Sequence, residues 1–327
     1  MRISVNDLTS LTRKAIVSFG YTSDEAEIIL KVLMFAQLRG NNQGVVKLIG
    51  SGIPMREGNG EPVTVKETTV SALIDGNGTH AMLVMDAMTD RAILKAKEHG
   101  MAIVGNFNTT ESTGALGYYV DKIASEGLIG FAYASAPFMT TAPYGSTEPL
   151  FCTNPFAVGI PTSNDPFLLD MSTSEIAYYG LIEAKTAGVN VSEGCGFDAS
   201  GAPTTDPAQI MSGAIKAFGG HKGSALALMV QLLAGSLVEA DSFDNESDNA
   251  GNLVMAIDPS ILTNKERFEN ENSEIIERIR SAKRIGSKNE IFVAGERGYR
   301  FKDGVLESGE IDIQDNLLSK LKEVAGE

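Results

Sequence analysis

Residues 218–233 read FGGHKGSALALMVQLL, a glycine-rich turn with one lysine followed by a long apolar run. The apolar and small side chains after Gly223 predict a buried helix. A helix start carries unpaired N–H groups and a partial positive charge, and Lys222 adds a full charge. This stretch therefore predicts a phosphate-binding site at Lys222 and Gly223. The alternative is a turn whose lysine is merely solvated.

Five other segments accompany this turn, in a fixed order between about residue 5 and about residue 300. They are RGNNQGVVKL at 39–48, GALGYY at 114–119, TNPFAV at 153–158, LDMSTS at 169–174 and GAPTTDP at 201–207. Together they resemble the type-2 malate/L-lactate dehydrogenase family. That family includes ureidoglycolate and sulfolactate dehydrogenases, diketogulonate reductase and cyclic-imine carboxylate reductases.

The resemblance implies an α/β (α+β) fold with a non-Rossmann, nicotinamide-binding sheet domain and a small helical lobe. No Gly-x-Gly-x-x-Gly occurs in the chain, which agrees with a cofactor site unlike the Rossmann crossover. We expect a helical lobe with the catalytic loop at 1–75, packed with the C-terminal part. A cofactor-binding domain at 76–250 should follow, and then a C-terminal strand and helices at 251–327 that return to the first lobe.

Composition and net charge limit the classes of function and partner that the chain can have. The 327 residues are 43% hydrophobic and 21% charged, which is ordinary for a globular enzyme. A formal net charge of −15 argues against nucleic acid or an anionic membrane as partner, because both attract basic patches. Two cysteines, Cys152 and Cys195, are too few for a disulfide framework or a metal-binding quartet, so no metal is expected. No signal peptide or membrane-spanning run is recognised, and the expected location is the cytoplasm.

Periodicity predicts helices over 6–19, from a capping box at Thr22 and Glu25 to about Gly40, and over 86–98 and 114–125. A helix capped by Thr263 and a last one around 317–321 follow. Buried strands are expected at 101–104, 128–134, 156–160 and 167–169. The acidic stretch 239–252 is expected to be a solvated loop, or alternatively a disordered interaction segment. Residues 205–207 indicate a structural turn.

Reduction of a 2-keto acid needs a hydride donor, an acid for the developing alkoxide and a holder for the carboxylate. Members of the resembled family usually carry a Ser-His-Gly triplet after the second helix, and its His donates the proton. Here that triplet reads Asn42-Gln43-Gly44, in a loop that is one residue shorter. A second functional His of the family corresponds to Ser112. Neither replacement titrates near neutral pH.

Other proton donors are therefore considered. His80 and His99 lie at turn signals and are expected at the surface, whereas His221 adjoins Lys222 and is a candidate for a catalytic or cofactor role. Tyr118 or a water is a further candidate. The resemblance places Lys47 where an Arg tends to bind the substrate carboxylate, although a lysine past a helix end is commonly just exposed.

Gln43 can orient a carbonyl through its amide but cannot transfer a proton. A protonated cyclic imine already carries its proton, so this substitution favours a cyclic 2-imino carboxylate over a 2-keto acid. Alternatively, Gln43 caps the preceding helix and the protein binds the cofactor without redox turnover, or uses the pocket for non-redox chemistry.

The resemblance also implies a cofactor, NAD or NADP, and a homodimer. The expected cofactor contacts are Ser135, Asp170, Met171, Ser172, Lys222, Gly223, Gly295 and Glu296. Asp170 to Ser174 should close a buried strand and start a helix that Ser172 or Thr173 could cap. Gly295 and Glu296 could instead form a surface turn.

Overall fold

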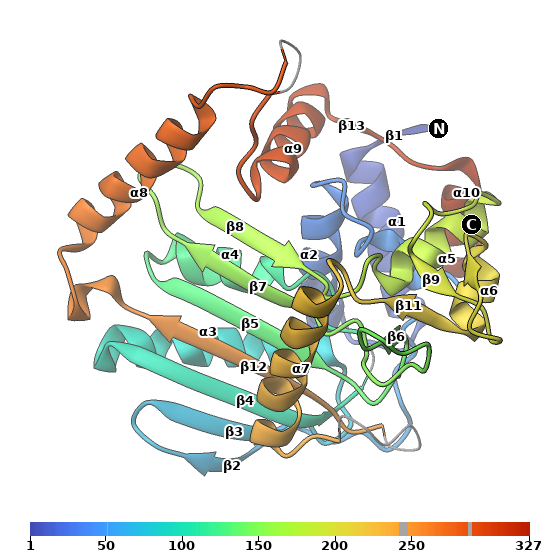
Figure 1. The fold of residues 1–327 in the computed structure, drawn as a ribbon. Coiled ribbons are helices and arrows are strands. Elements are labelled where there is room, and N and C mark those ends of the chain that lie inside the picture. Colours follow the sequence, from blue (N-terminus) through green and yellow to red (C-terminus); the bar gives the residue numbers. More distant parts are fainter. Residues whose placement is uncertain (51, 111, 242–247, 287–289) are drawn as a thin grey trace.

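The computed structural model describes the whole chain except residues 51, 111, 242–247 and 287–289. Its centre is a seven-stranded sheet in the order β2-β3-β4-β12-β5-β7-β8 (Figure 1). These strands are β2 (Val63–Glu67), β3 (Ser71–Asp75), β4 (Met101–Thr109), β5 (Ile129–Ser135), β7 (Phe156–Ile160), β8 (Phe167–Met171) and β12 (Ala250–Ile257). The β3–β4 pair is parallel and the other neighbouring pairs are antiparallel. A Rossmann sheet is mostly parallel, so the expected non-Rossmann α/β fold is confirmed.

Helices cover the two faces of this sheet unequally. Helices α3 (Ala81–His99) and α4 (Gly117–Ser125) lie along one face, and α7 (His221–Ala234) crosses the other (Figure 1). A Cβ on Gly159 of β7 would lie 2.3 Å from the backbone oxygen of Val120 in α4. A Cβ on Gly251 of β12 would lie equally close, at 2.3 Å, to the backbone oxygen of Ala234 in α7. Glycine is therefore needed on each face where a helix approaches the sheet.

A helical layer covers the outer side of α3. It contains α1 (Val5–Ser18) and α2 (Ser23–Gln37), and the predicted capping box of α2 is confirmed. Strand β1 (Arg2–Ser4) pairs antiparallel with β13 (Glu310–Asp312), and α10 (Asp315–Val324) packs on α1. The C-terminal residues thus lie beside the N-terminal helices. The large sheet itself draws strands from all three of the segments expected as domains.

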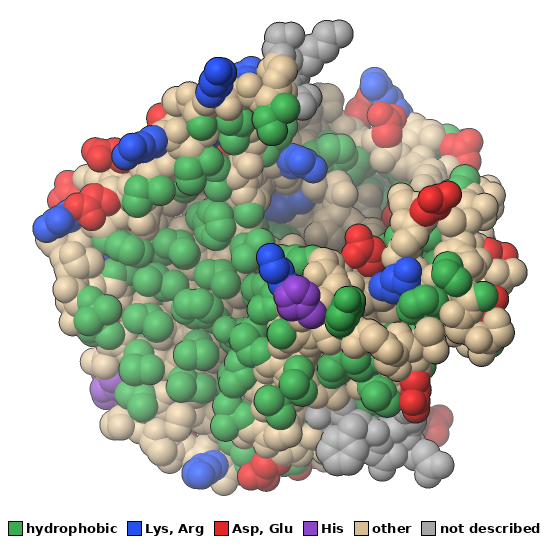
Figure 2. Space-filling view, viewed as in Figure 1, with side chains coloured by type: hydrophobic (Ala, Val, Ile, Leu, Met, Phe, Trp, Pro, Cys, Tyr) green, Lys and Arg blue, Asp and Glu red, His purple; other side chains and the backbone are tan. Residues whose placement is uncertain are grey.

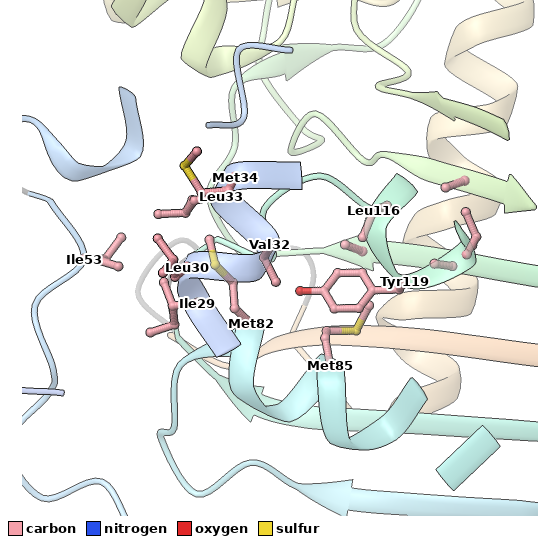
Figure 3. Packing of buried hydrophobic residues seen from close by; sticks show 14 of the residues in the cluster. Ile29, Leu30, Val32, Leu33, Met34, Ile53, Met82, Met85, Leu116 and Tyr119 are labelled. Carbon is pink, nitrogen blue, oxygen red and sulfur yellow. The ribbon is translucent and has the colours of Figure 1, made fainter. Parts of the chain in front are cut away.

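Apolar side chains of this layer join those beneath the sheet in one core. Figure 3 shows Ile29 and Leu33 of α2 close to Met82 of α3, with Met85 and Tyr119 beside them. All five are fully buried. The hydroxyl of Tyr119 donates to the backbone oxygen of Thr113 at 2.7 Å, which satisfies its one polar group. This core holds the ends of α2, α3 and α4 against the sheet.

A smaller unit lies beside the large sheet. Its four strands, in the order β10-β9-β11-β6, are β6 (Thr141–Ala142), β9 (Gly196–Phe197), β10 (Pro203–Thr204) and β11 (Ala214–Lys216). Helices α5 (Tyr178–Ala187) and α6 (Pro207–Ser212) pack with them. The expected turn at 205–207 starts α6, which Asp206 caps by accepting the N–H of Ala208 at 2.8 Å.

The remaining elements are α8 (Lys265–Arg280), α9 (Glu296–Ser308) and the short 3-10 helices η1 (Val45–Leu48), η2 (Ser236–Val238) and η3 (Pro259–Ile261). The predicted cap of α8 was wrong by one residue, because Asn264 and not Thr263 accepts the N–H of Arg267.

Two predictions around α7 need correction. The helix exists but is not buried all round: Leu228 is 49% and Leu232 is 53% exposed, since α7 packs on the sheet along one side only. The expected loop at 239–252 was also wrong at its end, because Ala250–Asn252 begin the central strand β12. Residues 242–247 of that stretch lie outside the described residues.

By length and composition, His221–Val238 is apolar enough to cross a membrane, contrary to the expectation that no such run exists. This is weak evidence, since a helix packed on a protein core passes the same test, and α7 contacts β5 and β12.

Candidate functional site

A cavity of about 820 Å³ opens at one edge of the large sheet. The carboxyl ends of β4, β5 and β8 meet there with the start of β12, and the first residues of α3 and α5 and the segment before α4 also line it. Its lining includes Asn41, Asn42, Gln43, Arg56, Ser112, Ser135, Phe138, Asp170, Met171, Ser172, Tyr178, Tyr179, Ile182, Met211 and Asp248. Its volume suits a small ligand together with part of a cofactor.

The loop after α2 brings Gln43 to this cavity. The Nε2 of Gln43 donates to Asn42 Oδ1 at 3.1 Å, and its backbone N–H donates to Asn41 Oδ1 at 3.0 Å. The end of α2 is closed instead by the N–H of Asn41, which donates to the oxygen of Ala36 at 3.0 Å. Gln43 therefore contacts its own loop, and the side-chain bonds recorded for it do not cap α2.

Lys47 and Ser112, both expected at the site, are in direct contact. The ammonium of Lys47 donates to Ser112 Oγ at 2.6 Å and lies 3.4 Å from the centre of the Tyr179 ring. Lys47 is only 1% exposed, so the alternative of a solvated surface lysine is wrong. Ser112 and Tyr179 line the cavity and Lys47 lies behind them. The lysine charge thus acts on the cavity through these two side chains.

Asp170 is the second-last residue of β8 and lines the cavity. Its Oδ2 accepts the backbone N–H of Gly117 at 2.8 Å, so the carboxylate caps the start of α4. Burial raises the pKa of Asp170 to about 6, although the Gly117 hydrogen bond opposes this rise. Asp170 is thus a cavity carboxyl that changes charge close to neutral pH.

Three other expected cofactor contacts, Ser135, Met171 and Ser172, also line the cavity. The hydroxyl of Ser172 donates to the backbone oxygen of Ser174 at 3.1 Å. The prediction that this segment starts a helix was wrong. Helix α5 begins only at Tyr178, with Ala177 as its N-cap.

The other expected residues lie outside the lining of the large cavity. The hydroxyl of Tyr118 donates to Asp86 Oδ1 at 3.1 Å, and burial with the Asp86 charge raises the pKa of this phenol. Gly295 lies against Leu168, while Glu296 lines a second cavity of about 270 Å³ and pairs with Arg280.

His221 and Lys222 start α7 and are exposed, with Gly223 buried beneath them. Backbone contacts connect this turn to the cavity. The N–H of Phe218 donates to the oxygen of Thr173 at 3.0 Å, next to Ser172. The glycine–lysine turn and the Ser172 segment are therefore neighbours, although they are separate in the sequence.

His80 was expected at the surface, and this was wrong because it is only 3% exposed. Its Nδ1 accepts the N–H of Met82 at 3.1 Å and caps α3. Burial, with a smaller effect of the Lys47 charge, lowers the pKa of His80 to about 3. His80 is therefore a neutral structural residue near the site. His99 is exposed, as expected.

Sequence reasoning missed the aromatic and charged walls of the cavity. Tyr178 and Tyr179 come from the first turn of α5, and Arg56 Nη1 lies 3.0 Å from Asp248 Oδ2. The adjacent tyrosines shortly after the Asp170 segment were the one available signal. Among the described residues, no group of three or more His, Cys, Asp or Glu side chains could hold a metal ion.

Comparison with known proteins identifies relatives along the whole chain. The sequence model of the family described as malate/L-lactate dehydrogenase matches residues 3–322. A malate/(S)-sulfolactate dehydrogenase of Methanothermus fervidus is 33% identical, covering 100% of this chain and 98% of that protein. A Δ1-pyrroline-2-carboxylate/Δ1-piperideine-2-carboxylate reductase of Pseudomonas putida is 31% identical, covering 100% and 97%.

A solved structure shows a similar fold along the whole chain. The crystal structure of Δ1-piperideine-2-carboxylate reductase from Pseudomonas syringae superposes with a TM-score of 0.83 at 27% identity, covering 99% of both chains.

Proposed function

Because this chain belongs to the malate/L-lactate dehydrogenase family, we propose that it reduces a small 2-oxo or cyclic 2-imino carboxylate with NADH or NADPH. The observation that carries the proposal is the single cavity lined by Gln43, Ser112 and Asp170. An amide donor, a hydroxyl and a carboxyl with a pKa of about 6 are thereby assembled around one small ligand.

The cofactor is proposed to enter along Ser135, Asp170, Met171 and Ser172, with its phosphates toward Lys222. Support comes from the cavity volume and from the contact between Phe218 and Thr173, which connects the two segments. When bound, the cofactor supplies the hydride. Glu296 lines a separate cavity and Gly295 lies against Leu168, so a role for them requires a cofactor that extends beyond the large cavity.

Charge at the cavity favours an imine over a ketone. Above about pH 6, Asp170 is a carboxylate, which stabilises a protonated C=N⁺ and disfavours a developing alkoxide. Gln43 orients the substrate with its amide and does not need to release a proton. We therefore propose that a cyclic 2-imino carboxylate is reduced faster than the matching keto acid.

The same walls favour a substrate with one negative charge. Arg56 is the one cation among the described lining residues, and it already pairs with Asp248. Other lining residues are apolar or aromatic, among them Phe138, Tyr178, Ile182 and Met211. A second carboxylate or a sulfonate would find no matched cation among these four residues.

We also propose a homodimer. The face of the large sheet that α7 crosses carries partly exposed apolar residues, visible as a continuous green area in Figure 2. This apolar face contains Ile103, Phe131, Val158 and Met255 of the strands with Leu228 and Leu232 of α7. Apolar patches of this kind commonly mark protein interfaces.

A second candidate function is cofactor binding without redox turnover, or non-redox use of the pocket. It is favoured by one observation: neither Gln43 nor Ser112 has a side chain that titrates near neutral pH. The test combines calorimetry with NADH and NADPH and the absorbance of reduced nicotinamide with a panel of cyclic imines and keto acids. Cofactor binding without any loss of absorbance would replace the reductase by this second candidate.

A further inference from the structure

The hydroxyl of Ser112 is placed to act only as a donor. Its Oγ accepts from the ammonium of Lys47 at 2.6 Å and from the backbone N–H of Gly114 at 3.3 Å. A serine oxygen has two lone pairs and one proton, so both lone pairs are occupied. Ser112 must therefore direct its O–H toward an acceptor.

That acceptor is not supplied by the part of the chain that the structure describes, where Ser112 has no recorded bond in which it donates. Ser112 lines the large cavity, so a ligand there can receive the proton of this hydrogen bond. Ser112 is partly buried, and a donor there without a partner is unfavourable, which adds to its preference for an acceptor on the ligand.

The charge behind Ser112 selects an anionic acceptor. Lys47 is buried behind the lining, with the Tyr179 ring over its ammonium, and a substrate reaches its charge through Ser112. Hydrogen bonds become shorter and stronger when one group is ionised, and the ammonium also polarises the serine hydroxyl. Arg56, the cation on the lining itself, is held by Asp248.

We propose that Ser112 anchors the substrate carboxylate and that Lys47 is a positioning residue that acts through Ser112. The inference rests on the proposed function and adds the group that receives the carboxylate. It replaces the expectation that Lys47 contacts the carboxylate directly. Gln43 and Asp170 then face the reacting C=N or C=O group.

The test uses pyrrole-2-carboxylate, a planar analogue of a cyclic imino acid that cannot accept the hydride. Its affinity for the cofactor-loaded protein is measured by calorimetry for native protein and for Ser112→Ala. We expect the alanine variant to bind about tenfold or more weakly, as for a lost hydrogen bond to a charged group. Ser112→Thr, which keeps the hydroxyl, should restore most of the affinity.

A matched ligand separates the anchor from general damage. Pyrrole-2-carboxamide has the same shape without the charge, so it should bind native protein and Ser112→Ala with similar, weak affinity. Lys47→Met should weaken the carboxylate more than the carboxamide, because its charge acts through Ser112. If that variant does not fold, the serine variants and the two ligands decide the question.

Kinetics distinguish this anchor from a proton donor. For an active enzyme, Ser112→Ala should raise KM about tenfold with kcat changed less than about twofold. A fall in kcat at unchanged KM, with unchanged affinity for pyrrole-2-carboxylate, would overturn the proposal and make Ser112 part of proton transfer. If native protein oxidises no cofactor with any substrate, the reductase proposal fails, while calorimetry still decides on the anchor.

Discussion

The ammonium of Lys47 donates a 2.6 Å hydrogen bond to the hydroxyl of Ser112, 65 residues further along the chain. The resemblance seen in the sequence places an Arg at the first position and a His at the second. The structure brings both departures into one contact beside the cavity. A change at the position of the second functional His and a change in the carboxylate holder are therefore physically coupled in this chain.

Gln43→His should increase the reduction of keto acids. An imidazole at this loop position could donate the proton that the Gln43 amide cannot, and the gain should fall as pH rises through about 6.5. The rate of keto-acid reduction against pH checks this. Asn42→His, one residue away on the same loop, is the matched control. Equal effects of both variants would show that position 43 has no special role.

Asp170→Asn should change how stability depends on pH. The pKa of Asp170 in the folded chain is about 6, above its ordinary 3.8, so the folded state binds its proton more tightly. The resulting stabilisation is present below pH 3.8 and lost as pH rises through about 6. The asparagine stays neutral, so the variant should gain stability relative to native protein between about pH 4 and about pH 7.

Urea unfolding of native protein and of Asp170→Asn, each at about pH 4 and at about pH 7, measures this difference in stability. A stability difference that is the same at the two values would contradict a raised pKa. Turnover should fall in the variant, because the neutral amide no longer favours a protonated imine.

Lys222→Ala should weaken the binding of NADH or NADPH at least about tenfold, or 1.4 kcal/mol. The reason is the loss of a full charge at the start of α7, beside the Thr173 segment that Phe218 contacts. Calorimetry measures the affinity. Lys66→Ala, at an exposed lysine of β2, serves as control. If both variants retain native affinity, this turn does not belong to the cofactor site.

Leu228→Glu combined with Leu232→Glu should convert a dimer into a monomer. Both leucines are about half exposed on α7, and two charges in the apolar face would be buried on association. Light scattering at micromolar concentration gives the mass of each protein. Leu262→Glu, at an 88% exposed leucine outside that face, should remain dimeric. A native monomer would reject the dimer proposal.

Local signals predicted much of the fold. The capping box at Thr22 and Glu25 marked the start of α2, and short apolar runs marked β4, β5, β7 and β8. A strand was expected within 251–327, but its start was not located, because the acidic residues before it predicted a loop that extends to residue 252. The exposed side of α7 could not be foreseen, since periodicity alone does not show which neighbours cover a helix.

The site was predicted only in part, because local sequence signals locate segments but not the tertiary contacts between them. Gln43, Ser112 and Asp170 stand in recognisable segments, and the fold brings them to one cavity. The burial of Lys47 depends on packing of η1 against α2 and α5, and His80 is buried at the start of α3 with the Tyr21 ring against it; no local pattern records either contact. The Arg56–Asp248 pair joins positions 192 residues apart, so only the tertiary structure reveals it.

We propose above all that this chain is a nicotinamide-dependent reductase that prefers a cyclic imine. Its most direct test is a comparison of kcat/KM for Δ1-pyrroline-2-carboxylate and 2-oxopentanoate, the open-chain keto acid with the same carbon skeleton. The loss of reduced-nicotinamide absorbance is followed with NADH and with NADPH. We expect a higher kcat/KM for the imine with at least one cofactor. Equal or faster reduction of the keto acid would contradict the imine preference, and no turnover of either substrate with cofactor bound would contradict the reductase itself.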